Sequence, residues 1–294
     1  MTDTIKISLR ISLAILLGFS LVVPQAYANH SWGKYHWDLS TVATIANPLN
    51  LGDNLTNGWS TNLSTASVDW NASVLKNEVV PGASNANCDP TLGGVEVCNA
   101  EYGSNNWLGI AQVWTYRRGG HIAQAVVQLN DTYFNTPTYN TNPWRNLVMC
   151  QEVGHTFGLG HQDENFSNTN LGTCMDYTSD PTGLAGSSGT LNNEHPNQHD
   201  YDQLVSIYAH LNETSGGSNG NGGKGKSLTA PNITSSAQSD WGQAIAQDAQ
   251  GRDSVFVRSK NGFEVTTHVL WTMEYEGHAT AVQLRNSSIE NKLL

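Results

Sequence analysis

The sequence has little charge, few cysteines and no long apolar run beyond its N-terminal segment, and each shortage excludes a class of protein. Only 13% of the 294 residues are charged, and 14 Lys and Arg stand against 25 Asp and Glu, for a net charge of -11. A surface of this sign repels phosphate backbones, so we expect no nucleic-acid partner. A transmembrane helix needs about 20 apolar residues, and no later segment supplies them, so we expect no stable membrane insertion.

The N-terminal segment is organised like an export signal. Lys6 and Arg10 precede an apolar run over residues 11–23, and Ala26-Tyr27-Ala28 follows as a small-residue cleavage pattern. We expect residues 1–28 to be a signal peptide and the mature protein to be secreted into the extracellular space. A retained N-terminal anchor is the alternative, although the run is short for a membrane span.

The segment CQEVGHTFGLGH carries the clearest chemical pattern. On a helix, Gln151 and His155 lie one turn apart on the same face, and Glu152 points toward the same cleft. Gly158 suits the end of that helix, because a residue without Cβ can take the left-handed conformation that returns the chain and delivers His161. The pattern therefore predicts a three-ligand metal site with an open position.

This segment resembles the signature HExxHxxGxxH of the metzincin zinc endopeptidases, and the matrixin-like secreted members in particular. Met175 and Tyr177, in CMDY, match the methionine turn that follows the signature in that family. The resemblance covers about residues 35–211. It departs at Gln151, which stands where the first histidine is expected, and Gln162 matches no better-known subfamily.

The resemblance implies roles for the matching residues. One catalytic Zn²⁺ is held by Gln151, His155 and His161, Glu152 is the general base, Met175 lies beneath the metal and Tyr177 donates to the transition state. Zinc lowers the pKa of water from about 15.7 toward roughly 7, and Glu152 moves the proton to the leaving amine. An amide oxygen is a weaker zinc ligand than imidazole, so Gln151 should lower the affinity.

Other side chains near the motif in sequence offer alternatives for the third ligand, but without motif support: Asp163, Asp176, His195 and His199. The two histidines precede an apolar-periodic segment and fit better in a turn and the start of a final helix. A calcium site in these loops is conceivable, although no recognisable loop signature supports it.

Four cysteines fit an oxidising compartment and suggest two disulfides instead of a thiolate metal cluster. We favour Cys88 with Cys98 and Cys150 with Cys174 among the three pairings that four cysteines allow. The second pair would tie the start of the metal-binding helix to the methionine turn. Such a link restricts the unfolded chain and so stabilises the folded state by about 3 kcal/mol.

Periodicity and turn residues predict an α+β domain, and the resemblance implies a twisted mixed sheet, a long active-site helix, a methionine turn and a C-terminal helix. We predict strands at residues 35–39, 94–98, 108–116 and 121–129, and helices through Trp59, Leu63, Ala66 and Trp70, over 144–161 and over 200–211. In the family, a strand of the kind formed by residues 121–126 edges the cleft and pairs with extended substrate. An edge strand has free backbone groups for this purpose, and His121 is expected to be a strand residue, not a ligand.

The chain after the final helix changes character. Residues 29–212 are expected to form the metzincin-like domain, and residues 213–227, rich in Gly, Ser and Asn, a flexible linker. Residues 228–294 are predicted to be a small β-rich tail, with strands at 254–257 and 264–275 and a core around Trp241 and Trp271. It is either an accessory unit for surface or substrate attachment or a partly ordered tail.

Two functions compete. The first is a secreted, monomeric zinc-dependent endopeptidase that hydrolyses peptide bonds in a protein or peptide substrate. The alternative is a catalytically inactive metzincin-fold protein that serves as a secreted or surface binding module. Glu152 favours the enzyme, because a pure binder has no need of a general base beside two histidines.

Overall fold

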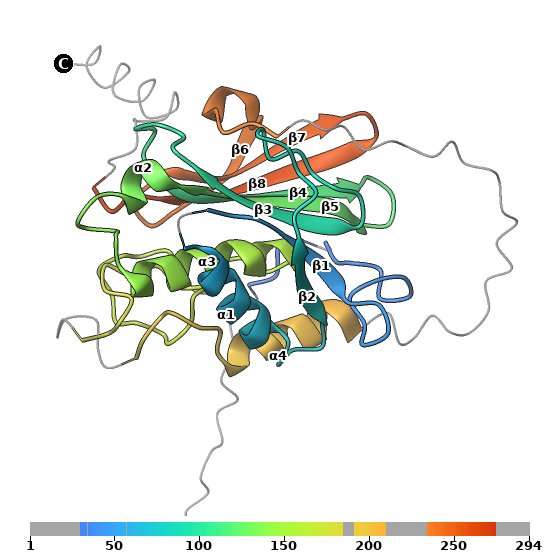
Figure 1. The fold of residues 1–294 in the computed structure, drawn as a ribbon, viewed down its shortest axis with the longest axis horizontal. Coiled ribbons are helices and arrows are strands. Elements are labelled where there is room, and N and C mark those ends of the chain that lie inside the picture. Colours follow the sequence, from blue (N-terminus) through green and yellow to red (C-terminus); the bar gives the residue numbers. More distant parts are fainter. Residues whose placement is uncertain (1–29, 34, 57, 185–190, 210–233, 275–294) are drawn as a thin grey trace, which may run out of the picture.

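The protein is built on one mixed sheet with helices packed against one of its faces (Figure 1). The computed structural model describes residues 30–33, 35–56, 58–184, 191–209 and 234–274. The expected signal peptide and linker lie outside these residues. The fold class is α+β, as predicted from the sequence.

The sheet has eight strands in the order β2-β1-β3-β5-β4-β8-β7-β6. In chain order they are β1 (Leu49–Asn54), β2 (Asn77–Pro81), β3 (Gly94–Ala100), β4 (Trp107–Tyr116), β5 (Ile122–Asn130), β6 (Gln243–Gln247), β7 (Asp253–Lys260) and β8 (Phe263–Trp271). The pairs among β2, β1, β3 and β5 are parallel. From β5 through β4, β8 and β7 to β6 the pairing is antiparallel.

The helices are α1 (Ser60–Trp70), α2 (Asp131–Phe134), α3 (Asn142–Thr156) and α4 (Gln198–Tyr208), with a 3₁₀ turn, η2, at Gln238–Asp240. Helix α3 begins where the Thr141 side chain accepts from the Trp144 amide. Helix α4 begins in a capping box, in which Asn197 and Asp200 each bond the other's backbone amide. These caps satisfy donors that a helix start leaves free, which sets where both helices begin.

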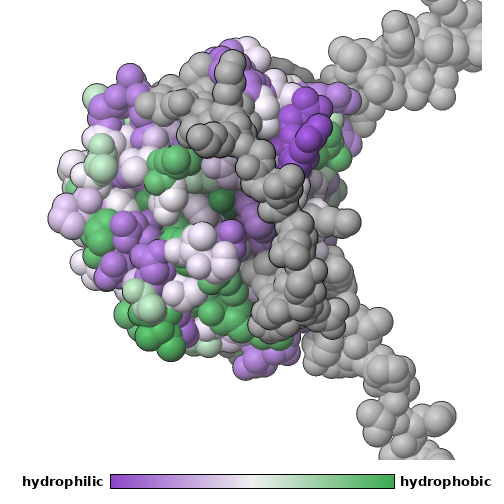
Figure 2. Space-filling model, turned by 90° about the vertical axis from the view of Figure 1, so that its right-hand side faces the viewer, coloured by the Kyte–Doolittle hydropathy of each residue, from purple (hydrophilic) through white to green (hydrophobic). Residues whose placement is uncertain are grey.

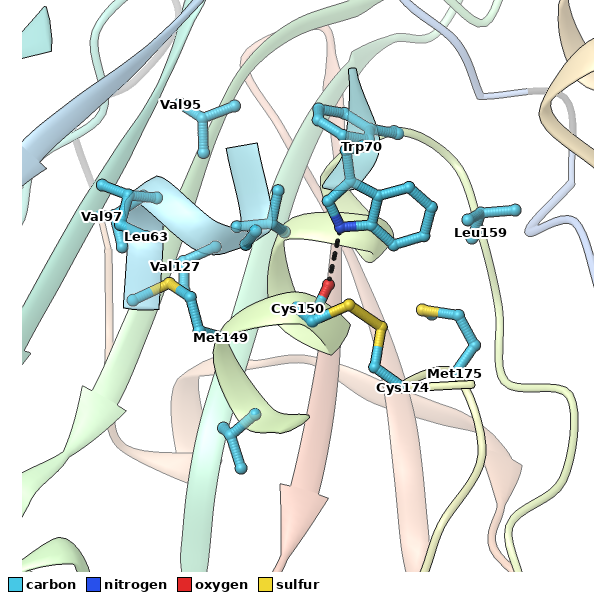
Figure 3. Close-up of a cluster of buried hydrophobic side chains, with 14 of the residues drawn as sticks. Leu63, Trp70, Val95, Val97, Val127, Met149, Cys150, Leu159, Cys174 and Met175 are labelled. Atoms are coloured by element: carbon cyan, nitrogen blue, oxygen red, sulfur yellow. Dashed lines mark hydrogen bonds between the residues drawn. A yellow bond between two sulfur atoms is a disulfide. The ribbon is translucent and has the colours of Figure 1, made fainter. Parts of the chain in front are cut away.

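The main core lies between α1, α3 and the sheet (Figure 3). Trp70 is fully buried there, and its indole N–H donates to the Cys150 carbonyl at 3.1 Å. Its ring also lies close to Gly154, because a Cβ added at that glycine would meet Trp70 Cζ2 at 2.8 Å. The lack of a side chain at Gly154 therefore lets α3 approach α1 closely.

Most predicted elements of the first part of the chain are confirmed. The strands expected at 94–98, 108–116 and 121–129 are β3, β4 and β5, the helix through Trp59 to Trp70 is α1, and the final helix is α4. The strand predicted at 35–39 is wrong, since only His36 forms an isolated bridge there, to His121. Strands β1 and β2 were not predicted, because LNLGDN and NEVVP contain Gly, Asp, Asn and Pro, which are poor strand formers.

The helix predicted over residues 144–161 differs from the prediction at both ends. Helix α3 starts at Asn142 and stops at Thr156, short of the predicted residue 161. Gly158 follows with φ +103°, and its N–H donates to the His155 carbonyl at 3.1 Å. As expected for this glycine, the left-handed conformation ends the helix and sends the chain back toward His161.

The C-terminal strands join the same sheet instead of forming a separate one. The strands expected at 254–257 and 264–275 are β7 and β8, and β6 adds a third. Trp241 and Trp271 do pack together, but their cluster includes Trp107 and Ile110 of β4. A small hairpin cannot bury a core by itself, so these strands share the core of the preceding domain.

The prediction that residues 121–126 form an edge strand is wrong. Residues 122–126 lie in β5, which is bonded on one side to β3 and on the other to β4. All of β5 is buried, as expected for a strand covered on both faces. Strand β4 is not an edge either, because β8 pairs with it along its length.

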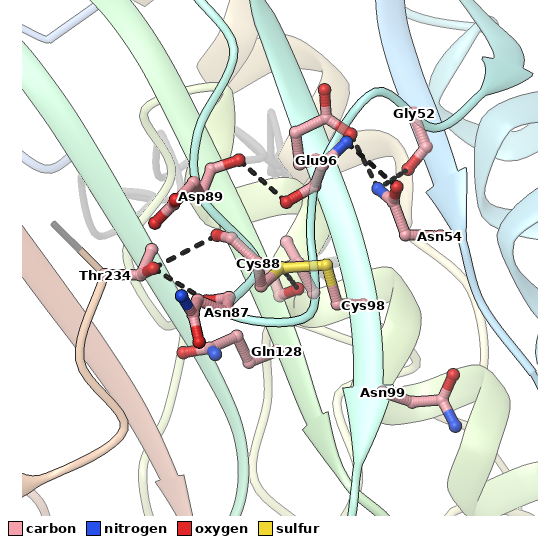
Figure 4. Close-up of a disulfide and its surroundings, with 12 residues drawn as sticks. Gly52, Asn54, Asn87, Cys88, Asp89, Glu96, Cys98, Asn99, Gln128 and Thr234 are labelled. Carbon is pink, nitrogen blue, oxygen red and sulfur yellow. Dashed lines mark hydrogen bonds between the residues drawn. A yellow bond between two sulfur atoms is a disulfide. The ribbon is translucent and has the colours of Figure 1, made fainter. Parts of the chain in front are cut away.

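Both predicted disulfides are confirmed. Cys150 bonds Cys174 and so ties α3 to the methionine turn, with the pair close to Met175 (Figure 3). Cys88 bonds Cys98 at the outer face of the sheet, where the Thr234 hydroxyl donates to the Cys88 carbonyl at 3.2 Å (Figure 4). Thr234 opens the described C-terminal segment, so that segment contacts the first domain from its start.

On the face drawn in Figure 2, hydrophobic side chains occur among hydrophilic ones without forming a single apolar belt. Large apolar side chains such as Ile45 and Leu184 are exposed singly, which is normal for a protein surface. Within the described residues, none of the helices combines the length and apolar character that crossing a bilayer requires.

Candidate active site

Helix α3 and the turn after it bring the motif residues together. Gln151, Glu152 and His155 are almost completely buried, with exposed fractions of 0%, 0% and 2%. The turn is held tightly, since a Cβ at Gly158 would lie 2.3 Å from the Tyr35 carbonyl oxygen. Only glycine fits there, and the path of the chain to His161 depends on it.

The two motif histidines meet edge to face, with ring centroids 4.5 Å apart. His155 Nδ1 lies 2.8 Å from the Leu159 carbonyl oxygen, and His161 Nδ1 lies 2.6 Å from Glu164 Oε1. Both oxygens are acceptors, so each Nδ1 carries the proton and each Nε2 keeps its lone pair. This orientation of the second nitrogen by an outer acceptor is the one that metal-binding histidines usually have.

Gln151 is also oriented by a hydrogen bond to one of its two polar side-chain atoms. Its Nε2 donates to the Cys174 carbonyl at 2.8 Å, while its Oε1 is buried without a hydrogen-bond partner. His161 Nε2 is buried and unpartnered as well. Buried polar atoms are normally bonded, so these two acceptors fit a site that takes a cation.

Glu152 occupies a buried position on α3, about one turn before His155. Both carboxylate oxygens are buried without a partner, and a Cβ at Gly109 of β4 would lie 2.7 Å from Oε1. Burial raises the pKa of this carboxyl well above its ordinary value. A raised pKa suits a group that accepts and returns a proton near neutral pH.

Met175 and Tyr177 both lie close to the motif residues. A Cβ at Gly154 would be 2.7 Å from Met175 Sδ, so the methionine packs against α3. The Tyr177 ring lies 4.7 Å from the His161 ring, centroid to centroid. Burial raises the pKa of Tyr177 well above 10, which keeps its hydroxyl a donor.

A third histidine that the sequence did not single out lies against these two. His268 of β8 stacks on His155 with centroids 4.2 Å apart and planes 10° from parallel, and its Nδ1 is buried without a partner. Burial, and next the neighbouring His161, lowers the pKa of His268 to about 3. Burial likewise lowers the pKa of His155 well below its ordinary value, so both rings are neutral.

The donor set fits a zinc ion only in part. Among the described residues, no three His, Cys, Asp or Glu side chains are arranged to hold a metal. His268 is stacked parallel to His155, so the lone pairs of these two rings cannot meet at one ion in this conformation. The residues that fit are therefore His155, His161 and the free amide oxygen of Gln151.

The other sequence candidates differ in how near they lie to the motif histidines. His195 Nδ1 lies 2.7 Å from Asp69 Oδ2, and the His199 ring lies against His30 with centroids 4.8 Å apart. Asp163 and Asp176 pair through their backbones. Burial raises the pKa of Asp176 to about 7, and the neighbouring His161 acts against that rise. Asp176 Oδ1 is buried without a hydrogen-bond partner, so of the four candidates Asp176 lies near His161.

His30 is a second histidine that sequence reasoning missed. Its Nδ1 lies 3.1 Å from the Gly160 carbonyl, and its Nε2 lies 3.6 Å from Asp200 Oδ1. The residue therefore links the turn that carries His161 to the start of α4. No spacing in the sequence could reveal it, because it lies far from the motif along the chain.

Comparison with protein-family models and with curated protein sequences finds no match for this chain. The resemblance to metzincins therefore rests on the motif residues of the sequence alone.

Proposed function

We propose that the protein is a secreted zinc-dependent endopeptidase, with Gln151, His155 and His161 as zinc ligands and Glu152 as general base. The observation that supports this most is Glu152: a buried carboxyl without a hydrogen-bond partner, about one helical turn before His155, while the Nδ1 atoms of His155 and His161 are both engaged. A structural role would leave that carboxyl with a partner. The two disulfides agree with an oxidising compartment.

The residues divide the chemistry between them. Bound zinc would polarise the substrate carbonyl and activate water. Glu152 takes the proton from the attacking water and passes it to the leaving amine. The Tyr177 hydroxyl, held neutral by burial, donates to the oxygen on which charge develops. Glu164 and the Leu159 carbonyl hold the two imidazoles in place.

A non-catalytic binding protein is the second candidate. It is favoured by Gln151, which replaces a better ligand, and by the cover that β8 places over the site. Such a protein would keep the fold and use its surface to capture a partner. The two candidates differ in catalysis, because only the endopeptidase cleaves peptide bonds and needs Glu152 to do so.

The proposal is tested by metal content and by Glu152→Ala. We expect about one zinc per purified mature chain by mass spectrometry, and chelator-sensitive cleavage of an unfolded protein substrate. Glu152→Ala should lower cleavage by roughly 10² or more with zinc retained, because general bases contribute at least that much. Negligible zinc together with no cleavage in excess zinc would exclude the enzyme, and equal activity of the variant would assign the cleavage to a contaminant.

A further inference from the structure

The sheet edge that would receive a substrate is taken by the protein's own C-terminal strand. β8 runs antiparallel to β4 from the pair Trp107 and Trp271 to the pair Tyr116 and Phe263. A protease that binds extended peptides offers the backbone groups of an open strand to them. Here β8 supplies the matching backbone groups from within the chain, on the side of β4 away from β5.

Three successive residues of β8 reach the candidate active site. The His268 ring covers the His155 ring, and the Val269 carbonyl accepts the Tyr177 hydroxyl at 3.2 Å. Leu270 pairs with Gly109, the residue of β4 that Glu152 approaches. One short segment of β8 therefore contacts the same protein groups that a bound peptide would contact under the proposed function.

The contacts that fasten this strand lie mostly on the opposite face of the sheet. Trp241, Phe256 and Val269 pack there with Trp107 and Ile110 of β4. On the same face Gln112 Nε2 donates to the Thr267 hydroxyl at 3.0 Å. The side chains of these residues lie on the face of the sheet away from α3, so the attachment of β8 can be weakened by side-chain substitutions that leave the backbone contact of Val269 with Tyr177 in place.

We propose that β8 is an internal occupant of the side of β4 away from β5, and that it keeps an extended polypeptide strand from pairing there. The candidate site is then open to a peptide only when the C-terminal hairpin, made of β6, β7 and β8, leaves β4. The inference rests on the proposed function and names the class of ligand: an extended peptide segment.

A disulfide between β4 and β8 tests this directly. Gln112 and Thr267 are directly opposite each other, and opposite residues of antiparallel strands lie about 4.5–5.5 Å apart, within reach of a disulfide. We expect the zinc-loaded double variant Gln112→Cys and Thr267→Cys to cleave protein at least ~10-fold more slowly than wild type when oxidised. Reduction should restore the rate, with wild type treated alongside.

The matched control places the same bond inside the hairpin. Gln243→Cys with Val257→Cys links β6 to β7 and leaves β8 free to separate from β4. We expect this variant to cleave at the wild-type rate when oxidised. Equal slowing in both stapled variants would show that rigidity of the hairpin, not occupation of β4, sets the rate, and would overturn the inference.

Peptide binding gives a readout that does not depend on cleavage. The probe is a fluorescein-labelled nonapeptide with the sequence of residues 265–273. We expect it to bind Trp241→Ala at least ~10-fold more tightly than wild type, because that variant loses packing that holds the hairpin, and not to bind the oxidised β4–β8 staple. Val269→Ala serves the same purpose should Trp241→Ala not fold.

The outcomes separate the two proposals. If the β4–β8 staple cleaves and binds the probe as wild type does, β8 does not occupy the site, while proteolysis stands. If no variant cleaves but the staple still prevents probe binding, the binding site stands and the proposed function fails. Absence of probe binding to both opened variants would overturn the site itself.

Discussion

At the scale of single residues, the site is set by which atom of each side chain is already engaged. The Cys174 carbonyl holds the amide nitrogen of Gln151, and this leaves the amide oxygen free. His161 follows the same pattern, with its Nδ1 bonded to Glu164 and its Nε2 buried without a partner. The orientation of Gln151 therefore leaves available the atom that the proposed zinc site needs.

Replacing Gln151 tests this orientation. Gln151→His should tighten zinc binding by on the order of tenfold, because imidazole is a better zinc ligand than an amide oxygen. Gln151→Leu is the control of similar size and should weaken it. Competition with a chromophoric chelator measures both. An affinity that neither substitution changes would mean that Gln151 does not face the ion.

Gly158 gives a prediction about the turn that delivers His161. Gly158→Ala should lower the free energy of unfolding by about 2 kcal/mol or more, since it combines a left-handed φ with a clash against the Tyr35 carbonyl. Gly119→Ala is the control, with a similar φ of +98° but open space around it. Urea unfolding should show the smaller loss for Gly119→Ala, and equal losses would contradict the role of the clash.

At the scale of elements, α1, the turn after it and the start of α4 are joined by polar contacts. The Tyr201 hydroxyl donates to the Asp69 carbonyl at 3.0 Å, and His195 bonds the Asp69 carboxylate. The hydrogen bond to Asp69 is the main cause that raises the pKa of His195, with Glu194 adding to it. The contact therefore links the position of α4 to the charge on one imidazole.

This contact predicts a pH dependence of stability. Because the folded pKa of His195 lies above its unfolded value of about 6.5, its stabilisation is complete below that value and is lost as pH rises through the folded pKa. The pair is partly exposed, so the loss should be under ~1 kcal/mol. His195→Gln should remove this pH-dependent part of the free energy of unfolding, measured by urea unfolding between about pH 6 and 9. A variant whose unfolding free energy depends on pH as that of wild type does would contradict the role of His195.

At the scale of the whole molecule, the C-terminal strands complete a sheet that the first domain leaves open at β4. The apolar cluster of Trp107, Ile110, Trp241, Phe256, Val269 and Trp271 belongs to both parts. Buried Arg252 strengthens the hairpin, with bonds to Asp248 and to the Thr272 carbonyl. The two parts of the chain therefore share buried surface, although the sequence between them is rich in glycine.

Trp241 tests how strongly the parts are joined. Trp241→Ala should cost about 3–5 kcal/mol of stability, as expected for a buried tryptophan, and should speed hydrogen exchange in β8 more than in β3. Ile245→Ala, at a position 48% exposed on β6, is the control and should change little. Uniform acceleration across β3 and β8 would show that the hairpin does not open separately.

Much of the site could be predicted from local pattern, whereas its cover could not. The spacing of Gln151, His155, Gly158 and His161 determines a helix and a turn, because both depend on neighbours a few residues apart. Both favoured cysteine pairs are confirmed, and that of Cys150 with Cys174 was favoured because His155 and Met175 must lie close together if they share a site. Strands β3, β4 and β5 were readable from their apolar and β-branched residues.

The sequence by itself determined the motif, its helix and the residue types of the site. Only the tertiary structure decided the strand neighbours of β4, the place of His268 on His155 and the contact of Tyr177 with Val269. The physical reason is how far apart along the chain the deciding contacts are. Helices and turns obey contacts between near neighbours in the chain, while the pairing of strands is settled by which surfaces bury one another across the folded molecule.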